Sequence, residues 1–392
     1  MSHHVPLSVL DLVPISSGSN APTAIANTVR LAQRTEQLGY RRYWLAEHHL
    51  NPGVAGTTPA LLMAIVANAT SHIRVGSAAV QMGHQTPLAV VEQFGILDAL
   101  HPGRIDLGLG RSGAPKPSAL VGATTSGSVP SAAGPRVTDK GLVIPAAFSF
   151  AHLATAPRFR MQAALLQQPG ARTPDYAAQV DELLSLLDGA YVDDDGNPAQ
   201  VVPGTHAPIE VWVLGSSPGT SAHVAGARGL RFGANYHVAP SAVLDAIDAY
   251  RSAFRPCASL GRPYVTVSAD VVVAPTDEEA AEVATGYGLW VRSIRTGQGA
   301  IPFPSPDEAR AHQWSVADRE LVSDRLATQF VGSPSSVADR LEVLAEETGA
   351  DELLITTITH RHDDRVRSYE LLAAEWKARE SRLRAQRSRG LW

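Results

Sequence analysis

The chain has 392 residues, of which 44% are hydrophobic, and this is enough to bury a large core. Its net charge of -5 comes from 33 basic and 38 acidic residues scattered along the chain, which favours small-molecule partners over nucleic acid or a membrane surface. Cys257 is the one cysteine, so an intramolecular disulfide and a cysteine-built metal centre are excluded. The N-terminus lacks signal-peptide features and no apolar run is long enough to span a bilayer, so we expect a cytoplasmic protein.

Short apolar runs alternate with amphipathic stretches along the whole chain. The first unit is a strand at 7–13 and a helix with Thr23 as its expected N-cap and Gly39 at its end. Further strands are predicted at 40–46, 73–80, 104–110, 208–214, 230–235, 264–273 and 351–358, and helices at 58–69, 87–100, 175–189, 218–229, 240–255, within 276–348 and at 363–388. Such strands pair in parallel, and eight units close a barrel. The pattern predicts one α/β domain over 1–392, a (β/α)8 TIM barrel, rather than an open doubly wound sheet.

Two segments do not fit the repeat. Residues 112–172 are rich in Gly, Ala, Ser and Pro, and residues 295–314 form a second irregular stretch after the seventh strand. Both leave from the carboxyl ends of strands, which is the face where barrels carry their active sites. We therefore interpret 112–172 as a long insertion or active-site loop and 295–314 as a lid.

Three titratable residues, Glu47, His48 and His49, follow the second strand in the run YWLAEHH. A buried strand would have to provide each of them with a partner or shift its pKa. An ordinary structural role is the alternative, with one histidine satisfied in the core and the others in solvent. Their place at the carboxyl end of a barrel strand favours a functional role.

A second candidate site combines two strand ends. The run GLGRS (108–112) brings two glycines and Arg111, but it lacks the third glycine and the later acidic residue of a dinucleotide fingerprint. The run LGSSPGTSAHVAG (214–226) is a turn followed by a helix, with Gly215 and the hydroxyls of Ser216, Ser217 and Thr220. A helix N-terminus beside an arginine is suited to phosphate, whereas simple capping by serine is the alternative reading of the turn alone.

The ordered motifs WLAEHH, VGSAAVQMGHQTPLAVVEQFGILDALHPGRIDLGLGRS, VWVLGSSPGTSAHVAGARGL, FVGSPSSVADRL and DELLITTITH resemble the bacterial-luciferase-like flavin monooxygenases. The resemblance spans the second to the eighth strand. It implies a barrel that binds reduced FMN, which meets O2 to form a flavin hydroperoxide and oxygenate a small organic substrate. A separate flavin reductase as the supplier of reduced FMN is also implied, and a homodimer is compatible with the resemblance.

The resemblance also implies roles for matching residues. His48 would lie near the reactive edge of the flavin, Ala78-Ala79 would be a non-prolyl cis bond supporting the ring, and Arg111 with Ser216 would contact the phosphate. His48 would move a proton, a task suited to a group that titrates near neutrality. We expect His49 to point to the opposite face of the strand as a structural residue, with Glu47 on the same side.

The sequence also departs from the family pattern. Gly110 stands where luciferase has a reactive cysteine, so light emission from an aldehyde is not expected. Residues 112–172 form a longer segment than the family's usual connection at this place. Arg172 is the candidate for a second phosphate-binding arginine. The identity of the substrate stays open.

Three other functions are compatible with parts of the sequence. Related barrels bind a deazaflavin and transfer hydride without oxygen. A metal-dependent barrel hydrolase could use His48, His49, His360 and His362. A barrel without catalytic activity could bind flavin or serve as a subunit.

Overall fold

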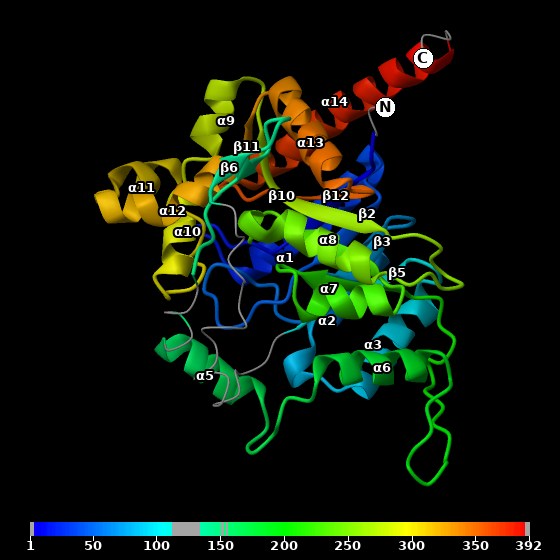
Figure 1. Ribbon diagram of the computed structural model, residues 1–392. Helices are drawn as coiled ribbons and strands as arrows, with labels where there is room; N and C mark the ends of the chain where they lie inside the picture. Colours follow the sequence, from blue (N-terminus) through cyan, green and yellow to red (C-terminus); the bar gives the residue numbers. More distant parts are fainter. Residues whose placement is uncertain (1–3, 112–133, 150–152, 154–155, 389–392) are drawn as a thin grey trace.

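The computed structural model describes residues 4–111, 134–149, 153 and 156–388 (Figure 1). Eight parallel strands form one closed sheet, in the order β1, β2, β3, β5, β8, β9, β10, β12 and back to β1. Their bounds are β1 (Leu7–Asp11), β2 (Arg42–Leu45), β3 (Arg74–Ser77), β5 (Ile105–Gly110), β8 (Glu210–Gly215), β9 (Arg231–Asn235), β10 (Val265–Val273) and β12 (Glu352–Thr356). Seven of the predicted strands contain one of these eight, and the predicted strand 208–214 overlaps β8, which ends one residue later at Gly215. The predicted (β/α)8 TIM barrel is therefore confirmed.

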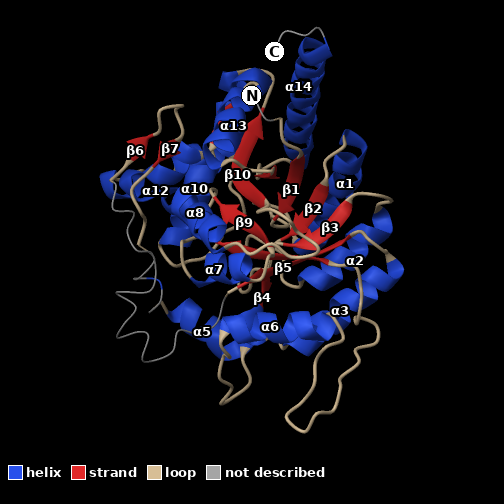
Figure 2. Cartoon of the chain, turned by 45° about the vertical axis from the view of Figure 1, so that its right-hand side comes forward, coloured by secondary structure: helices blue, strands red, loops and turns tan. Residues whose placement is uncertain are grey.

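Helices surround the strands, as Figure 2 shows. Those that follow the barrel strands are α1 (Ala21–Leu38), α2 (Pro59–Ala69), α3 (Pro87–Leu100), α6 (Tyr176–Leu187), α7 (Thr220–Ala227), α8 (Val243–Ala253), α13 (Pro334–Thr348) and α14 (His362–Ser388). The N-cap of α1 is Asn20 rather than Thr23: the Asn20 side chain accepts a hydrogen bond from the Thr23 N–H at 3.0 Å. Gly39 ends the helix as predicted, with φ at 82°, where a side chain would be strained.

The remaining elements are additions to the barrel. In the segment 112–172, β6 (Arg136–Val137) pairs with β7 (Val143–Ile144), α5 is Pro157–Leu166, and residues 112–133 lie outside the described part. Further elements are β4 (Val80–Gln81), β11 (Phe330–Gly332), α9 (Asp277–Val283), α10 (Tyr287–Arg295), α11 (Pro306–Ala311), α12 (Val316–Thr328), η1 (Met82–His84) and η3 (Pro240–Ala242). The predicted lid, 295–314, thus contains α11. None of the helices in the described ranges is long and apolar enough to cross a membrane.

The amino ends of the strands enclose a buried charged cluster. Arg42 on β2 donates to Glu352 on β12 at 3.1 Å, to Asp106 on β5 at 2.8 Å and to Glu210 on β8 at 2.9 Å. Burial by itself would lower the pKa of Arg42, but the three carboxylates outweigh it and raise that pKa. The cluster closes the floor of the barrel, opposite to the face where active sites lie.

Two buried tryptophans fill the interior directly above this floor. The rings of Trp44 and Trp212 meet edge to face with centroids 4.8 Å apart. Gly76 on the neighbouring strand makes room for them, because a Cβ there would lie 2.6 Å from two atoms of the Trp44 ring.

Replacing Gly76 with alanine is therefore expected to destabilise the fold by about 1–3 kcal/mol, the usual cost of overpacking a core. Urea unfolding followed by circular dichroism measures the change. Gly261→Ala is the matched control, because nothing lies within 4 Å of a Cβ at that position. Equal stability of the two variants would contradict the packing argument.

Candidate functional site

A cavity of about 1080 Å³ opens at the carboxyl ends of the barrel strands. Its volume is in the range of cofactor sites, and its lining combines apolar side chains with a few polar groups. Residues at or just after the carboxyl ends of five barrel strands, β2, β3, β5, β8 and β9, contribute to it, namely His48, Ala78, Ala79, Gly110, Arg111, Gly215, Ser216, Ser217, Asn235 and His237. Of the eight predicted site residues, Thr220 is the one that does not line this cavity.

Glu47, His48 and His49 all line the cavity, so the prediction that His49 points away from His48 is wrong. Strand β2 ends at Leu45, and the alternation of a pleated strand does not extend to these residues. Glu47 accepts hydrogen bonds from His49 Nε2 at 2.8 Å and from His84 Nε2 at 2.9 Å. The expected association of Glu47 with His49 is therefore present, and His84 is an additional partner.

The Glu47 carboxylate organises this end of the cavity. Besides the two imidazoles it accepts the backbone N–H of Gln81 at 2.9 Å. Burial by itself would raise the pKa of the Glu47 carboxyl, but hydrogen bonds from His84 and His49 outweigh it, so the pKa is lowered. Glu47 thus stays ionised and holds the two rings around it.

His48 differs from its neighbours because its ring has no hydrogen-bond partner in the part of the chain that the structure describes. Its Nδ1 atom is buried without a hydrogen bond in the described structure, while its backbone N–H donates to Gly56 O at 2.7 Å. Burial, together with the nearby His49, lowers the pKa of His48 to about 4. The expectation of a group that titrates near neutrality is therefore wrong, and the imidazole is neutral at pH 7.

The wall beside His48 is a backbone surface. The Ala78-Ala79 peptide bond is cis, as the resemblance implied, and it lies between β3 and β4. Across from it, Gly110 has no side chain, and a Cβ there would lie 3.1 Å from the Cβ of Ala79. Small residues at these three positions leave room for a planar group to lie against the backbone.

The polar end of the cavity lies where β5 and β8 end. Arg111 is exposed, and its Nη1 is 3.5 Å from Thr220 Oγ1 at the start of α7. Ser216 Oγ accepts a hydrogen bond from Asn235 Nδ2 at 3.0 Å. The structure brings the predicted phosphate residues together, whereas Arg172 is exposed and does not line the cavity.

Sequence reasoning missed His237 and Asp270, which also line the cavity. His237 follows β9 and shares a hydrogen bond between its Nδ1 and Ser268 Oγ, and burial lowers its pKa to about 4. Asp270 accepts from Arg325 at 2.9 Å and from the Tyr287 hydroxyl. Two signals in the sequence could have indicated these residues: an aspartate inside the apolar run YVTVSADVVV and a histidine just after a strand.

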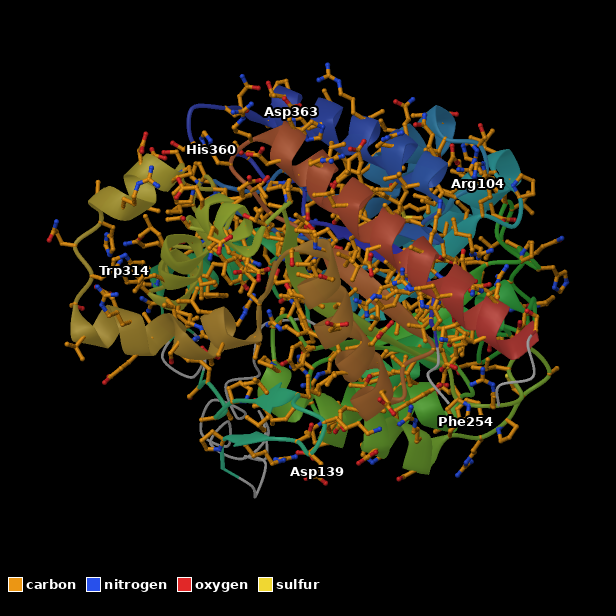
Figure 3. All side chains as sticks on the ribbon, turned by 90° about the horizontal axis from the view of Figure 1, so that it is seen from above. Arg104, Asp139, Phe254, Trp314, His360 and Asp363 are labelled. Atoms are coloured by element: carbon orange, nitrogen blue, oxygen red, sulfur yellow. The ribbon has the colours of Figure 1, made fainter. Side chains whose placement is uncertain are left out.

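The four histidines of the hydrolase alternative do not converge. His360 lies near the start of α14 (Figure 3), where its Nε2 contacts Ser17 O at 3.1 Å, and neither His360 nor His362 lines the cavity. Among the described residues, Glu47, His49 and His84 have the spacing of metal ligands, with ligand atoms within 4.8 Å. The same atoms are joined by the hydrogen bonds described above, which account for their proximity.

Described residues of both irregular segments contribute to the lining of the cavity. From the predicted insertion, α5 contributes Arg158, Phe159 and Arg160 to its lining. From the predicted lid, Ala300 lines it, and its N–H donates to Asn51 Oδ1 at 2.9 Å. Both segments are thus in contact with the residues that follow β2.

Comparisons with known proteins give one consistent family. A family model described as luciferase-like monooxygenase matches residues 5–136 and 154–352. A protein named luciferase-like monooxygenase from Escherichia coli (strain K12) is 31% identical over 368 residues, 94% of this chain and 96% of the relative. N-acetyl-S-alkylcysteine monooxygenase from Bacillus subtilis (strain 168) is 45% identical over 106 residues, 27% of this chain and 32% of the relative.

Among solved structures, the crystal structure of apo-MsnO8 superposes with a TM-score of 0.75 and 30% identity, covering 96% of this chain and 99% of that one. The family model spans most of the barrel and of the cavity residues described above. The chain therefore belongs to the luciferase-like monooxygenase family.

Proposed function

We propose that the protein uses reduced FMN and O2 to oxygenate a small organic substrate. The observation that carries this proposal is the convergence of three groups in one cavity: His48, the backbone wall at Ala78-Ala79, and the polar end around Arg111 and Ser216. Membership of the luciferase-like monooxygenase family supports the same reaction class.

The residues present fit FMN. A guanidinium and serine hydroxyls at the start of α7 would hold the phosphate, and the wall without large side chains would support the isoalloxazine ring. When bound, reduced FMN supplies the electrons with which O2 is activated, one oxygen atom entering the substrate and the other leaving as water. The protein contributes binding, orientation and exclusion of water.

His48 is the residue to which we assign a proton-handling role. Its ring is neutral and its Nδ1 is unpaired among the described residues, so it can accept a proton or a hydrogen bond from a reacting group in the cavity. The backbone N–H of His48 donates to Gly56 O at 2.7 Å, and the side chains of Glu47 and His49 on either side of it are hydrogen-bonded to each other at 2.8 Å. The segments around α5 and Ala300 would limit the access of water.

A separate flavin reductase is part of the proposal, because the GLGRS turn lacks the fingerprint of a nicotinamide dinucleotide site. The Bacillus subtilis relative named N-acetyl-S-alkylcysteine monooxygenase makes small thioethers reasonable first substrates to test. A homodimer and a cytoplasmic location also stay predictions.

The deazaflavin alternative is tested with the same protein. FMN and deazaflavin are each reduced under anaerobic conditions and mixed with the enzyme, a panel of thioethers and isotopically labelled O2. Mass spectrometry then measures the incorporation of label into the product. Label in the product with FMN alone is the expected result. Hydride transfer from reduced deazaflavin without oxygen would reject the proposal.

Arg111→Ala is expected to weaken FMN binding by about 1.5–3 kcal/mol, the contribution of a charge-assisted hydrogen bond. Quenching of flavin fluorescence on binding measures the affinity. Arg172→Ala is the control, because it removes the same charge from an exposed position outside the cavity. Unchanged affinity in Arg111→Ala would remove Arg111 from the phosphate site.

A further inference from the structure

The arginines that line the cavity fall into two groups. Arg295 is paired with Asp324 at 2.7 Å and Arg325 with Asp270 at 2.9 Å. Arg158, by contrast, has no carboxylate within 4.0 Å among the described residues. The cavity therefore contains a guanidinium that is not neutralised by the described protein.

Arg158 is half-buried and held in a defined place. Its Nε donates to Leu50 O at 3.0 Å and its Nη2 to His49 O at 3.3 Å. Gly299 makes room for the guanidinium, because a Cβ there would lie 2.5 Å from the Arg158 Cζ. A guanidinium has five N–H donors, so three more can reach a ligand.

The acids of the cavity do not compensate this charge. Glu47 already accepts from two imidazoles and a backbone N–H, and Asp270 is paired with Arg325. Arg160, on the same helix as Arg158, also lines the cavity and adds positive charge. An anion is the ligand that this part of the cavity can stabilise.

Arg158 lies at the His48 end, away from the polar end at Arg111. Arg158 contacts the carbonyl groups of His49 and Leu50, which follow β2. Arg111 follows β5, and its Nη1 is 3.5 Å from Thr220 Oγ1 at the start of α7. Burial also lowers the pKa of Arg158 itself, as expected for a partly desolvated cation without a counter-ion. The cavity thus has two cationic ends.

We propose that Arg158 binds a carboxylate or sulfonate of the substrate, so that the enzyme acts on small organic acids. This proposal rests on the proposed function, in which Arg111 takes the FMN phosphate and His48 faces the reacting atoms. A planar guanidinium matches such anions with two parallel hydrogen bonds. A neutral analogue would leave a partly desolvated charge unpaired, so the site discriminates against it.

The test is a calorimetric titration of the full chain, once saturated with oxidised FMN and once without flavin. The probes are methylthiobutanoate, methylthiopropanesulfonate and benzoate, each compared with its methyl ester. The variants are Arg158→Gln and Arg158→Lys, and Arg172→Gln is the control with the same charge change at an exposed position. FMN affinity and the unfolding temperature are measured for every variant.

We expect at least one acid to bind about tenfold or more tightly than its ester, the effect of one charge-assisted contact. The preference should disappear in Arg158→Gln, persist partly in Arg158→Lys and be unchanged in Arg172→Gln, with FMN affinity unchanged in all. No acid preference with any probe, or a preference that survives Arg158→Gln, would overturn the proposal. Weaker FMN binding in Arg158→Gln would also overturn it, because Arg158 would then belong to the phosphate site.

Failure of the proposed function gives a different result. A parent protein that does not bind FMN rejects the flavin reaction, whatever the acids do. An acid preference that depends on Arg158 in the flavin-free titration would still support the anion site.

Discussion

His48→Ala is expected to lower substrate oxygenation about 10²–10⁴-fold, the usual contribution of one acid–base group. His48 lines the cavity three residues after the end of β2, and no described residue is hydrogen-bonded to its Nδ1. Folding and FMN affinity should therefore stay close to those of the parent. Single-turnover measurements with reduced FMN and O2 give the rate of product formation.

Two other histidines are the controls for this result. His72→Ala removes a side chain that is 75% exposed, so its rate should equal that of the parent. His49→Ala also removes a cavity residue, but one bonded to Glu47, and we expect a smaller loss than for His48→Ala. If His48→Ala kept the parental rate while His49→Ala was inactive, His49 rather than His48 would be the residue that carries the chemistry.

The pH dependence of this activity follows from the lowered pKa of His48. Because burial lowers that pKa from 6.5 to about 4, the neutral ring persists until the pH falls towards 4. The rate of the step assigned to His48 should then stay constant through neutral pH and fall only in acid. The same shift makes folding less favourable as the pH drops from 6.5 towards 4, because the unfolded chain binds the proton first. A rate that changes through neutrality in the parent, but not in His48→Ala, would contradict this assignment.

Arg42→Met is expected to destabilise the barrel by about 3–5 kcal/mol, the usual cost of removing one partner from a buried ion pair. The Arg42 side chain is 1% exposed and joins Glu352, Asp106 and Glu210. Its loss leaves buried carboxylates short of hydrogen bonds. Chemical denaturation followed by circular dichroism measures the change, and FMN affinity of the folded protein should be unaffected, since the cluster lies at the other end of the barrel.

Arg41→Met is the matched control, at the adjacent position on the same segment. Arg41 is 46% exposed and 3.8 Å from Glu352, so this exposed ion pair should contribute at most about 1 kcal/mol. An equally small loss of stability in Arg42→Met would mean that Arg74 and Arg231 neutralise the carboxylates of the cluster in the absence of Arg42.

The barrel and the location of the site were predictable from sequence because both follow from local patterns. Alternating apolar runs and amphipathic stretches define eight strand and helix units, and parallel strands place all their carboxyl ends on one face. Residues just after strands, such as His48, Arg111 and Ser216, therefore had to lie near one another. The family resemblance added the cis bond at Ala78-Ala79, which no periodicity indicates.

The orientation and protonation of the site residues were decided by tertiary structure alone. His84 and Arg158 reach the residues after β2 from distant parts of the chain, and sequence spacing carries no information about such contacts. The strand pattern also misplaced His49, because β2 ends at Leu45. Beyond that point the conformation depends on the hydrogen bonds of His48 to Gly56 and of His49 to Glu47. The sequence by itself determined which elements form and on which face their ends meet. Only the packed barrel decided that His48 is neutral and that Arg158 has no carboxylate partner among the described residues, because burial and pairing depend on every element around the cavity.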